Sequence, residues 1–488
     1  MSAHPWPQRA RQAAWAVPLA LGLAGCATPG SAPQPLALAT AASAGLQASA
    51  TTTPWPQQAW WQALGDARLN NLMDQALANS PTLALASARL ARAQQGVDAL
   101  QAAQGPQAGL GADATRQHYT AKGLVPPPVA GHVYTNGSVQ ASGSIELDFF
   151  GKHQAALAAA LGQARAAQAD QQAARVLLAT QVARSWVALG RLVALREVAQ
   201  RTLDQRLALQ GLISQRVKAG LDTQIDQRQT DGTVHDAQGQ LAALDGQMAT
   251  ARHQLAVLSG QAPQALADWS PRLAANPQPA LPGQLGADLL GRRADVVAAR
   301  WRVEASMQDV ALARTQFYPD INLVGFVGLN ALGLDNLLNL NARNFGAGPA
   351  LRLPLFDGGR LRANLRGKAA DADAAVASYN ALVLDAVREA ADAVALLLSL
   401  RQQQVQQGAA QAAAVQAWRL AEQRFEAGLG TRLQVLAAES AVLAQRQANV
   451  DLFARALDAH LALVRALGGG WAGEAVAPAM ATTPAAAS

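Results

Sequence analysis

The chain of 488 residues contains a single cysteine, Cys26, and few aromatic or charged residues. One cysteine excludes an internal disulfide and a cysteine-based zinc cluster. Aromatic residues make up only 5% of the chain, too few for the cores of the several globular domains that this length suggests. Charged residues make up 15%, with a net charge of +6 and no long basic run. We therefore expect no nucleic-acid partner.

The sequence also lacks catalytic and metal-binding motifs. The seven histidines are scattered, and neither a Gly-x-Ser-x-Gly elbow nor a phosphate-binding loop occurs. Asp222 and Asp226 are one helical turn apart, but a solvated helix start near the positive end of the helix dipole explains them without catalysis. We expect a protein that is not an enzyme and holds neither a metal nor a cofactor. Arg292 and Arg293 are expected to form surface or subunit ion pairs.

The N-terminus has the layout of a secretory signal peptide. Arg9 and Arg11 precede a largely apolar stretch, and Gly25 stands directly before Cys26. The tetrapeptide 23–26 resembles a bacterial lipobox, which predicts that Cys26 is acylated and becomes the mature N-terminus; the alternative is an ordinary signal peptide followed by a chance cysteine. Ala27, rather than Asp, predicts sorting to the outer membrane of a Gram-negative bacterium. Because no later run of 18 apolar residues occurs, a membrane-spanning part would consist of strands.

Proline is absent from two stretches of more than a hundred residues, 129–262 and 355–477. Such gaps are what long uninterrupted helices require, because proline breaks helices. Ala, Leu, Gln and Arg, all strong helix formers, dominate both stretches. The predicted long helices and their returning partners are 152–216 with 222–259 and 360–426 with 431–468.

The two halves of the chain resemble each other. Arg216–Leu221 recurs as Arg424–Leu429, and both segments end in Ala-Gly-Leu. A repeat of this length is a duplicated domain half rather than a solenoid unit. Apolar residues at three- and four-residue spacing, such as Trp186 and Leu189, predict coiled-coil packing of each long helix along two shorter ones. The shorter helices that start the halves are expected over 66–104, interrupted near Pro81, and 288–317.

Alternation of apolar and polar residues predicts two strands in each half. The four predicted strands are 108–120, 133–147, 321–329 and 345–355. Four strands cannot close a barrel, and an open sheet cannot lie in lipid with unpaired edges. Three chains would supply about twelve strands, within the range of outer-membrane barrels. The sequence therefore predicts a homotrimer in contact with outer-membrane lipid, with the apolar set of 139–147 as the better candidate for the lipid face.

Aromatic residues are expected to form an interfacial girdle where strands meet helices. These residues are Phe149, Phe150, Phe317, Tyr318 and Phe356. Aromatic plugs in a soluble junction are the alternative. The predicted fold is mainly α with a membrane β-barrel: duplicated halves, long coiled-coil helical hairpins and four strands per chain, closing as a trimer.

Taken in order, several segments of the chain resemble the outer-membrane efflux protein family of the TolC- and OprM-like kind, specifically its NodT-type lipoprotein branch. The segments that carry the resemblance are Trp60-Trp61 through Leu69 to Asn79-Ser80-Pro81, Leu147–Gly151, Arg292–Val296, Pro354–Gly359 and the paired Ala-Gly-Leu turns. The resemblance covers nearly the whole mature chain. It implies a trimeric channel that continues as a helical barrel across the periplasm. It also implies docking with a periplasmic adaptor (membrane fusion) protein and an inner-membrane pump.

The resemblance further assigns roles to the two helical turns. In the family, the turns face the adaptor and can close like an iris. The matching adaptor-docking positions are Val217, Gly220, Leu221, Phe425, Gly428 and Leu429.

A periplasmic gate is expected next to these turns. Asp226 falls on an acidic position of the family's aperture, and Leu433 falls on an apolar constriction. Relatives carry Asp where this chain has Gln434 and Ala437, so the resemblance does not extend to an acidic ring at these positions of the second repeat; Glu439 is a shifted candidate. Arg432 is expected to latch with Asp226 between neighbouring hairpins. Two exposed charges that start separate helices are the alternative.

These observations predict six segments: a signal peptide (1–25), a lipid-anchored linker (26–55), a first efflux repeat (56–262), an equatorial connector (263–287), a second efflux repeat (288–470) and a C-terminal tail (471–488). The predicted function is a passive exit duct of a tripartite efflux system for drugs or other small toxic compounds. The alternatives are the outer-membrane duct of a type I polypeptide secretion system and a non-conducting periplasmic coiled-coil scaffold lipoprotein.

Overall fold

The computed structural model describes residues 36–46, 55–273 and 286–473, so the predicted signal peptide and Cys26 lie outside the described residues. The chain forms two compact units. The sheet unit consists of Leu90–Ala166 and Ala299–Tyr379, with the described residues up to Leu38. The helical unit consists of Ala39–Arg89, Ala167–Ala298 and the described chain from Asn380.

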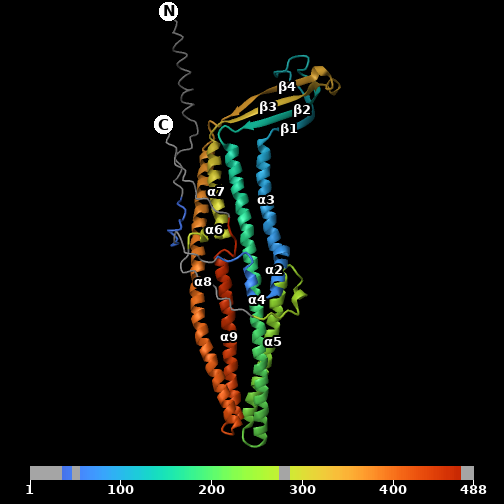
Figure 1. Ribbon diagram of the computed structural model, residues 1–488. Coiled ribbons are helices and arrows are strands. Elements are labelled where there is room, and N and C mark those ends of the chain that lie inside the picture. The colour runs from blue at the N-terminus through green and yellow to red at the C-terminus, as the bar shows by residue number, and fades with distance from the viewer. Residues whose placement is uncertain (1–35, 47–54, 274–285, 474–488) are drawn as a thin grey trace, which may run out of the picture. The chain divides into compact units, whose positions relative to one another are not determined.

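The order of the elements repeats in the two halves of the chain (Figure 1). The first half contains α3 (Pro81–Gln104), β1 (Gln107–His118), β2 (Val133–Leu147), α4 (Lys152–Lys218) and α5 (Gln224–Leu258). The second half contains α7 (Ala294–Thr315), β3 (Asp320–Leu332), β4 (Arg343–Arg352), α8 (Arg360–Glu426) and α9 (Arg432–Ala466). Shorter elements are η1 (Trp60–Leu64), α2 (Ala67–Asn79), η2 (Pro263–Leu266), α6 (Leu289–Arg292), η3 (Leu334–Asn336) and η4 (Leu340–Ala342).

The helices predicted from the proline gaps are confirmed. Helices α4 and α8 are each 67 residues long, and the returning helices α5 and α9 are each 35 residues long. The predicted break near Pro81 is confirmed as well: Ser80 is extended and Pro81 begins α3. The residue before a proline avoids the helical conformation, while proline itself fits the first helical position.

The strands were predicted in the right places, with errors at their ends. Strand β2 matches its prediction, but β3 continues to Leu332 and β4 runs from Arg343 only to Arg352. The prediction for β4 extended to residue 355, so alternation alone placed this end too far along the chain. All four strands form one antiparallel sheet in the order β1–β2–β3–β4, so the β2–β3 pair joins the two halves of the chain.

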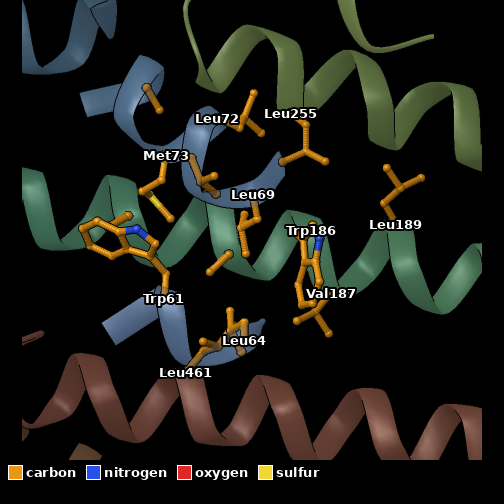
Figure 2. Close-up of a cluster of buried hydrophobic side chains, with 14 of the residues drawn as sticks. Trp61, Leu64, Leu69, Leu72, Met73, Trp186, Val187, Leu189, Leu255 and Leu461 are labelled. Atoms are coloured by element: carbon orange, nitrogen blue, oxygen red, sulfur yellow. The ribbon is translucent and has the colours of Figure 1, made fainter. Parts of the chain in front are cut away.

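A hydrophobic core holds the helical unit together (Figure 2). Side chains from α2, α4, α5 and α9 meet around Trp186, which is 1% exposed. The indole Nε1 of Trp186 donates to Asp66 Oδ2 at 2.9 Å. The other carboxylate oxygen of Asp66 caps α2 by accepting from the backbone N–H groups of Arg68 and Leu69. One carboxylate therefore fixes both the start of α2 and the largest core side chain.

Polar contacts set the order of the long helices in the helical unit. Arg196 of α4 pairs with Asp245 of α5 at 2.6 Å, and Arg191 of α4 pairs with Asp451 of α9 at 2.7 Å. On the far side of α9, Gln445 accepts from Gln407 of α8 at 2.9 Å. The helices therefore follow the order α5–α4–α9–α8. Because these pairs are largely exposed, they specify neighbours more than they stabilise the fold.

Helix α4 also contains a window of 18 residues that is apolar enough to cross a membrane by length and composition. However, 61% of that window is buried inside the structure. Packing against neighbouring helices explains its composition, so the window is weak evidence for a membrane-spanning helix.

Candidate functional site

The register of the four strands gives the sheet one continuous apolar face. Residues that pair directly across strands lie on the same face, and successive residues alternate between faces. Val139 pairs with Leu329, Ile145 with Leu323, and Val327 with Phe345. The members of this apolar face include Leu110, Val139, Ala141, Ile145, Leu147, Ile321, Leu323, Val327, Leu329, Phe345, Pro349 and Leu351.

This apolar face is exposed in the single chain. Leu110 is 77% exposed, Val327 is 62% exposed and Phe345 is 74% exposed. Contiguous apolar surface of this kind marks a membrane or protein contact. The strands contain 12, 15, 13 and 10 residues, and about 9–11 residues suffice to cross a bilayer.

The opposite face of the sheet is mostly polar. Its polar members include Gln107, Asp113, Ser138, Gln140, Ser142, Ser144, Glu146, Asn322, Asn330, Asn344 and Arg352. Ser138 donates a hydrogen bond to Asp113 on the neighbouring strand. Its large apolar members include Val324, Phe326 and Leu332. One face of the sheet therefore suits apolar surroundings, and the other suits water.

A charged cluster ties the sheet to α4. The Nζ of Lys152 lies 2.8 Å from Glu146 of β2 and 3.1 Å from Asp320 of β3. Asp148 accepts from the backbone N–H groups of Lys152 and Gln154, which fixes the first turn of α4. Two side chains of the segment 148–152 thus position the helix, which gives the motif a structural role.

The equivalent carboxylate in the second half is Asp357. It accepts from the backbone N–H groups of Gly359 at 2.9 Å and Leu361 at 2.7 Å. The hydrogen bond from Leu361 is the main cause that lowers the pKa of Asp357. The two junctions therefore share one way of starting a long helix with a carboxylate.

The predicted aromatic girdle is partly wrong. Phe149, Phe356 and Tyr318 are exposed, and Phe150 stacks on Tyr318 with ring centroids 4.9 Å apart. Phe317, in contrast, is 9% exposed and packs against Ala313, Leu361 and Leu365 in a small core. Sequence proximity placed Phe317 in the girdle, but its side chain points into the junction instead of outward.

The two helical turns share one backbone design. Gly220 and Gly428 both have φ of 73°, a left-handed conformation that favours glycine. In the first turn, Gly220 N–H bonds to Val217 O and Leu221 N–H bonds to Arg216 O. The second turn repeats both bonds, from Gly428 to Phe425 and from Leu429 to Arg424. This is the Schellman arrangement, and it leaves the side chains of Leu221 and Leu429 exposed.

Each returning helix begins with a capping box. Thr223 accepts from the backbone N–H of Asp226, whose carboxylate accepts from the backbone N–H of Thr223. Thr431 and Gln434 make the same reciprocal bonds at the start of α9. Because Asp and Gln can both accept the bond from the N-cap, capping accounts for the residues at both positions.

The side-chain chemistry of the two turns differs. Arg216 donates two hydrogen bonds to Asp222, at 2.7 and 2.9 Å, and these bonds are the main cause that lowers the pKa of Asp222. Asp222 precedes the N-cap, so it does not share a helix face with Asp226 as the sequence suggested. In the second turn Gly430 replaces the carboxylate, and Arg424 donates to the carbonyl of Leu429. The first turn is therefore clamped by an ion pair and the second is not.

The predicted gate residues lie around these turns. Hydrogen bonds from the side chain and then the backbone of Thr223 lower the pKa of Asp226. The guanidinium of Arg432 lies over the ring of Phe425, 5.8 Å from its centroid, and Leu433 is 41% exposed. Within this part of the chain, which the structure describes, Asp226 and Arg432 form no ion pair with each other. A latch between hairpins of different copies stays a prediction.

The prediction that Arg292 and Arg293 form surface or subunit ion pairs is wrong for Arg293. Arg293 is 6% exposed and pairs with Asp295 at 2.7 Å and with Glu389 at 2.9 Å. Arg465 reaches the other oxygen of Glu389 at 3.0 Å. Burial opposes ionisation of Asp295, yet the bonds from Arg293 prevail and lower its pKa. This buried network joins α8 and α9 to the start of α7, and Glu389 was not identifiable from sequence.

Within the described ranges, no group of three or more His, Cys, Asp or Glu residues could hold a metal ion. Two features remain. One is a two-faced sheet whose strands are long enough to cross a bilayer, and the other is a pair of helical hairpins with matched exposed turns. Together they define a membrane-sheet and helical-hairpin protein of duplicated design.

Comparison with known proteins identifies the family. The sequence model of the outer membrane efflux protein family matches residues 72–261 and 285–469. The chain therefore belongs to the outer membrane efflux protein family, and the resemblance drawn from sequence is confirmed.

Individual relatives span almost the whole chain. It is 35% identical to the multidrug resistance outer membrane protein MdtQ of Escherichia coli O157:H7 over 93% of this chain and 97% of the relative. It is 32% identical to the multidrug resistance outer membrane protein MdtP of Shigella flexneri, over 86% and 87%. The crystal structure of the outer membrane protein VceC from Vibrio cholerae matches with a TM-score of 0.78 and 35% identity, over 86% of this chain and all of that one. This is a family of channel proteins, not of enzymes.

Proposed function

We propose that this protein is the passive outer-membrane exit duct of a tripartite multidrug efflux system. The observation that carries the proposal is the two-faced sheet, in which an exposed apolar face lies opposite a polar one. In lipid, the apolar face contacts acyl chains and the polar face lines water. Relatives named as multidrug resistance outer membrane proteins support drugs as the exported compounds.

The proposal includes closure as a homotrimer. Within the chain's own sheet, β1 and β4 each have one neighbouring strand. Unpaired backbone groups are too costly in hydrocarbon for such edges to stay open. Three copies supply about twelve strands, an even number within the known range of outer-membrane barrels.

The exposed turns support docking to a periplasmic adaptor, which connects the duct to an inner-membrane pump. Leu221 is 66% exposed and Leu429 is 71% exposed, each held out by a Schellman turn. Two matched apolar tips per chain suit helical hairpins of an adaptor, with Val217, Gly220, Phe425 and Gly428 completing the tips.

The two-faced sheet also disfavours a non-conducting scaffold, which would need no apolar sheet face.

The proposal further includes the predicted segments and a lipid anchor. Residues 1–25 are removed as a signal peptide, Cys26 carries the lipid, and residues 26–55 link it to the first repeat. The repeats (56–262 and 288–470) flank the connector 263–287, and 471–488 form the tail. Two or more acyl chains anchor a protein stably. Mass spectrometry should find Cys26 acylated at the mature N-terminus, and an unmodified mature protein that begins downstream would contradict the anchor.

The direct test of the duct is single-channel conductance in planar bilayers, combined with native mass spectrometry of the detergent-solubilised protein. We expect ion-conducting particles of three subunits. A stable monomer with full conductance would contradict the trimer, and a trimer without conductance would contradict the duct.

A further inference from the structure

The polar face of the sheet contains an open hollow of about 430 Å³. Its floor is shallow because the strand register brings small side chains together. Ser142 of β2 pairs directly with Gly109 of β1, and Ser144 lies two residues along β2 on the same face. Two hydroxyl groups and a bare backbone therefore form the floor.

Larger side chains border this floor. Gln107 of β1 pairs with Ser144, and Phe326 of β3 pairs with Ser142 from the other side. Gln140 follows along β2 and is flanked by glycine on both neighbouring strands, Gly111 and Gly328. Val324 of β3 pairs with Ser144. Two amide groups, one aromatic ring and one aliphatic side chain thus surround two hydroxyls.

The ring of Phe326 is held in place by the next strand. Phe326 pairs with Gly346 of β4, and a Cβ added to Gly346 would lie 3.0 Å from two ring atoms. The ring therefore rests on the bare backbone of β4, and it remains 37% exposed. Phe326 therefore exposes an aromatic ring to the hollow, which Val324, two residues earlier on β3, also lines.

We propose that this hollow is a weak contact site for uncharged aromatic compounds that carry amide or hydroxyl groups. The side chains that line it include no charged group, so it does not select ions. Amides and hydroxyls both donate and accept hydrogen bonds, and the Phe326 ring offers a stacking surface. The inference rests on the proposed function, because the polar face meets exported compounds only if it lines the duct.

The test uses chloramphenicol as probe, since it combines an aromatic ring with an amide and hydroxyl groups and carries no charge. Single channels in planar bilayers should show brief current blockades when chloramphenicol is added. Phe326→Ala should shorten the mean blockade by about two- to tenfold, as expected for the loss of one aromatic pair. Phe326→Leu, which keeps bulk without a ring, should shorten it similarly.

Phe345→Ala is the matched control. Phe345 pairs with Val327, the residue after Phe326, and therefore lies on the opposite, apolar face. It should leave the blockades unchanged. Gln140→Ala provides a second variant, expected to shorten blockades through a lost hydrogen bond, if Phe326→Ala does not form channels.

The outcomes separate the two proposals. Parent protein that forms no channel contradicts the proposed function, and the contact site falls with it. Parent channels that conduct normally but show no blockades contradict the contact site alone. Equal blockade times in Phe326→Ala, Gln140→Ala and Phe345→Ala channels would also overturn it.

Discussion

The helical unit and the sheet unit bury their apolar side chains in different places. In the helical unit, Trp186 and Leu461 are 1% and 0% exposed within a single chain. In the sheet unit, Val327 and Phe345 remain mostly exposed. Apolar burial is the main driving force of folding, so the helical unit has a core within one chain, while the apolar face of the sheet gains such burial only from apolar surroundings. The stability of the two units should therefore depend on different surroundings.

The largest effect is expected from the core of the helical unit. Trp186→Ala should lower the free energy of unfolding by about 3–5 kcal/mol, because it leaves a cavity among well-packed neighbours. It also leaves Asp66 without the indole donor. Urea unfolding followed by circular dichroism in detergent measures the change. Trp186→Phe, which fills most of the volume, should lower the free energy of unfolding by less. Equal urea midpoints for the parent and Trp186→Ala would contradict the claim that this core stabilises the helical unit.

The second-largest effect is expected from a charge on the apolar face of the sheet. Val327→Lys should cost about 2–4 kcal/mol if the residue lies at the bilayer midplane, because a charge enters hydrocarbon. Folding into phospholipid vesicles against urea measures the cost. Asn330→Lys is the control, since Asn330 pairs with Ser138 on the polar face. If Asn330→Lys is the more costly change, the assignment of the faces is wrong.

A smaller, pH-dependent effect should distinguish the two turns within the helical unit. Asp222 and Asp226 have pKa values lowered by folding, so their ionised forms stabilise the first turn above pH about 4, the unfolded value. This contribution disappears as the pH falls through the folded values. The second turn has Gly430 and Gln434 instead, which do not titrate.

Hydrogen exchange, corrected for intrinsic rates, checks this difference. Protection of the Thr223 amide, which donates to the Asp226 carboxylate, should fall as the pH drops below about 4, while the Thr431 amide, which donates to Gln434, stays protected. The double variant Asp222→Asn, Asp226→Asn should remove the pH dependence of α5. Parallel loss of protection in both turns would show that acid acts on the whole unit instead.

The smallest effect is expected where copies of the helical unit meet. Asp226→Ala or Arg432→Ala should raise the conductance of the isolated channel, most visibly at low salt, if a latch joins neighbouring hairpins. The double variant should add less than the sum of the single variants. Conductance equal to the parent at every salt concentration in both single variants would show that the latch does not exist.

Local patterns in the sequence predicted most of the fold. Two proline gaps located α4 and α8, and alternation located all four strands, because both signals depend on neighbouring residues. The repeated turn at Gly220 and Gly428 was visible for the same reason. Strand ends were less predictable, since the alternation continues to residue 355 whereas β4 ends at Arg352.

Features that depend on residues far apart in the chain could not be predicted from the sequence. The sequence predicted Arg293 as a surface residue, because its partner Glu389 is 96 positions away in the chain. The faces of the sheet required the register between β2 and β3, and only that register places Phe326 on the mostly polar face. Phe317 likewise turned inward because Leu361 and Leu365 lie against it.

The β2–β3 pair has a consequence for how such a chain could be divided. This seam joins the first repeat to the second through twelve paired positions, from Asn136 with Leu332 to Leu147 with Ile321. In a closed ring, β4 of one copy would pair with β1 of the next copy. A second repeat would then pair with a first repeat between chains, just as β2 and β3 pair a first repeat with a second repeat within a chain. Cutting the connector between the repeats should then turn a trimer of whole chains into a hexamer of half-chains with the same perimeter.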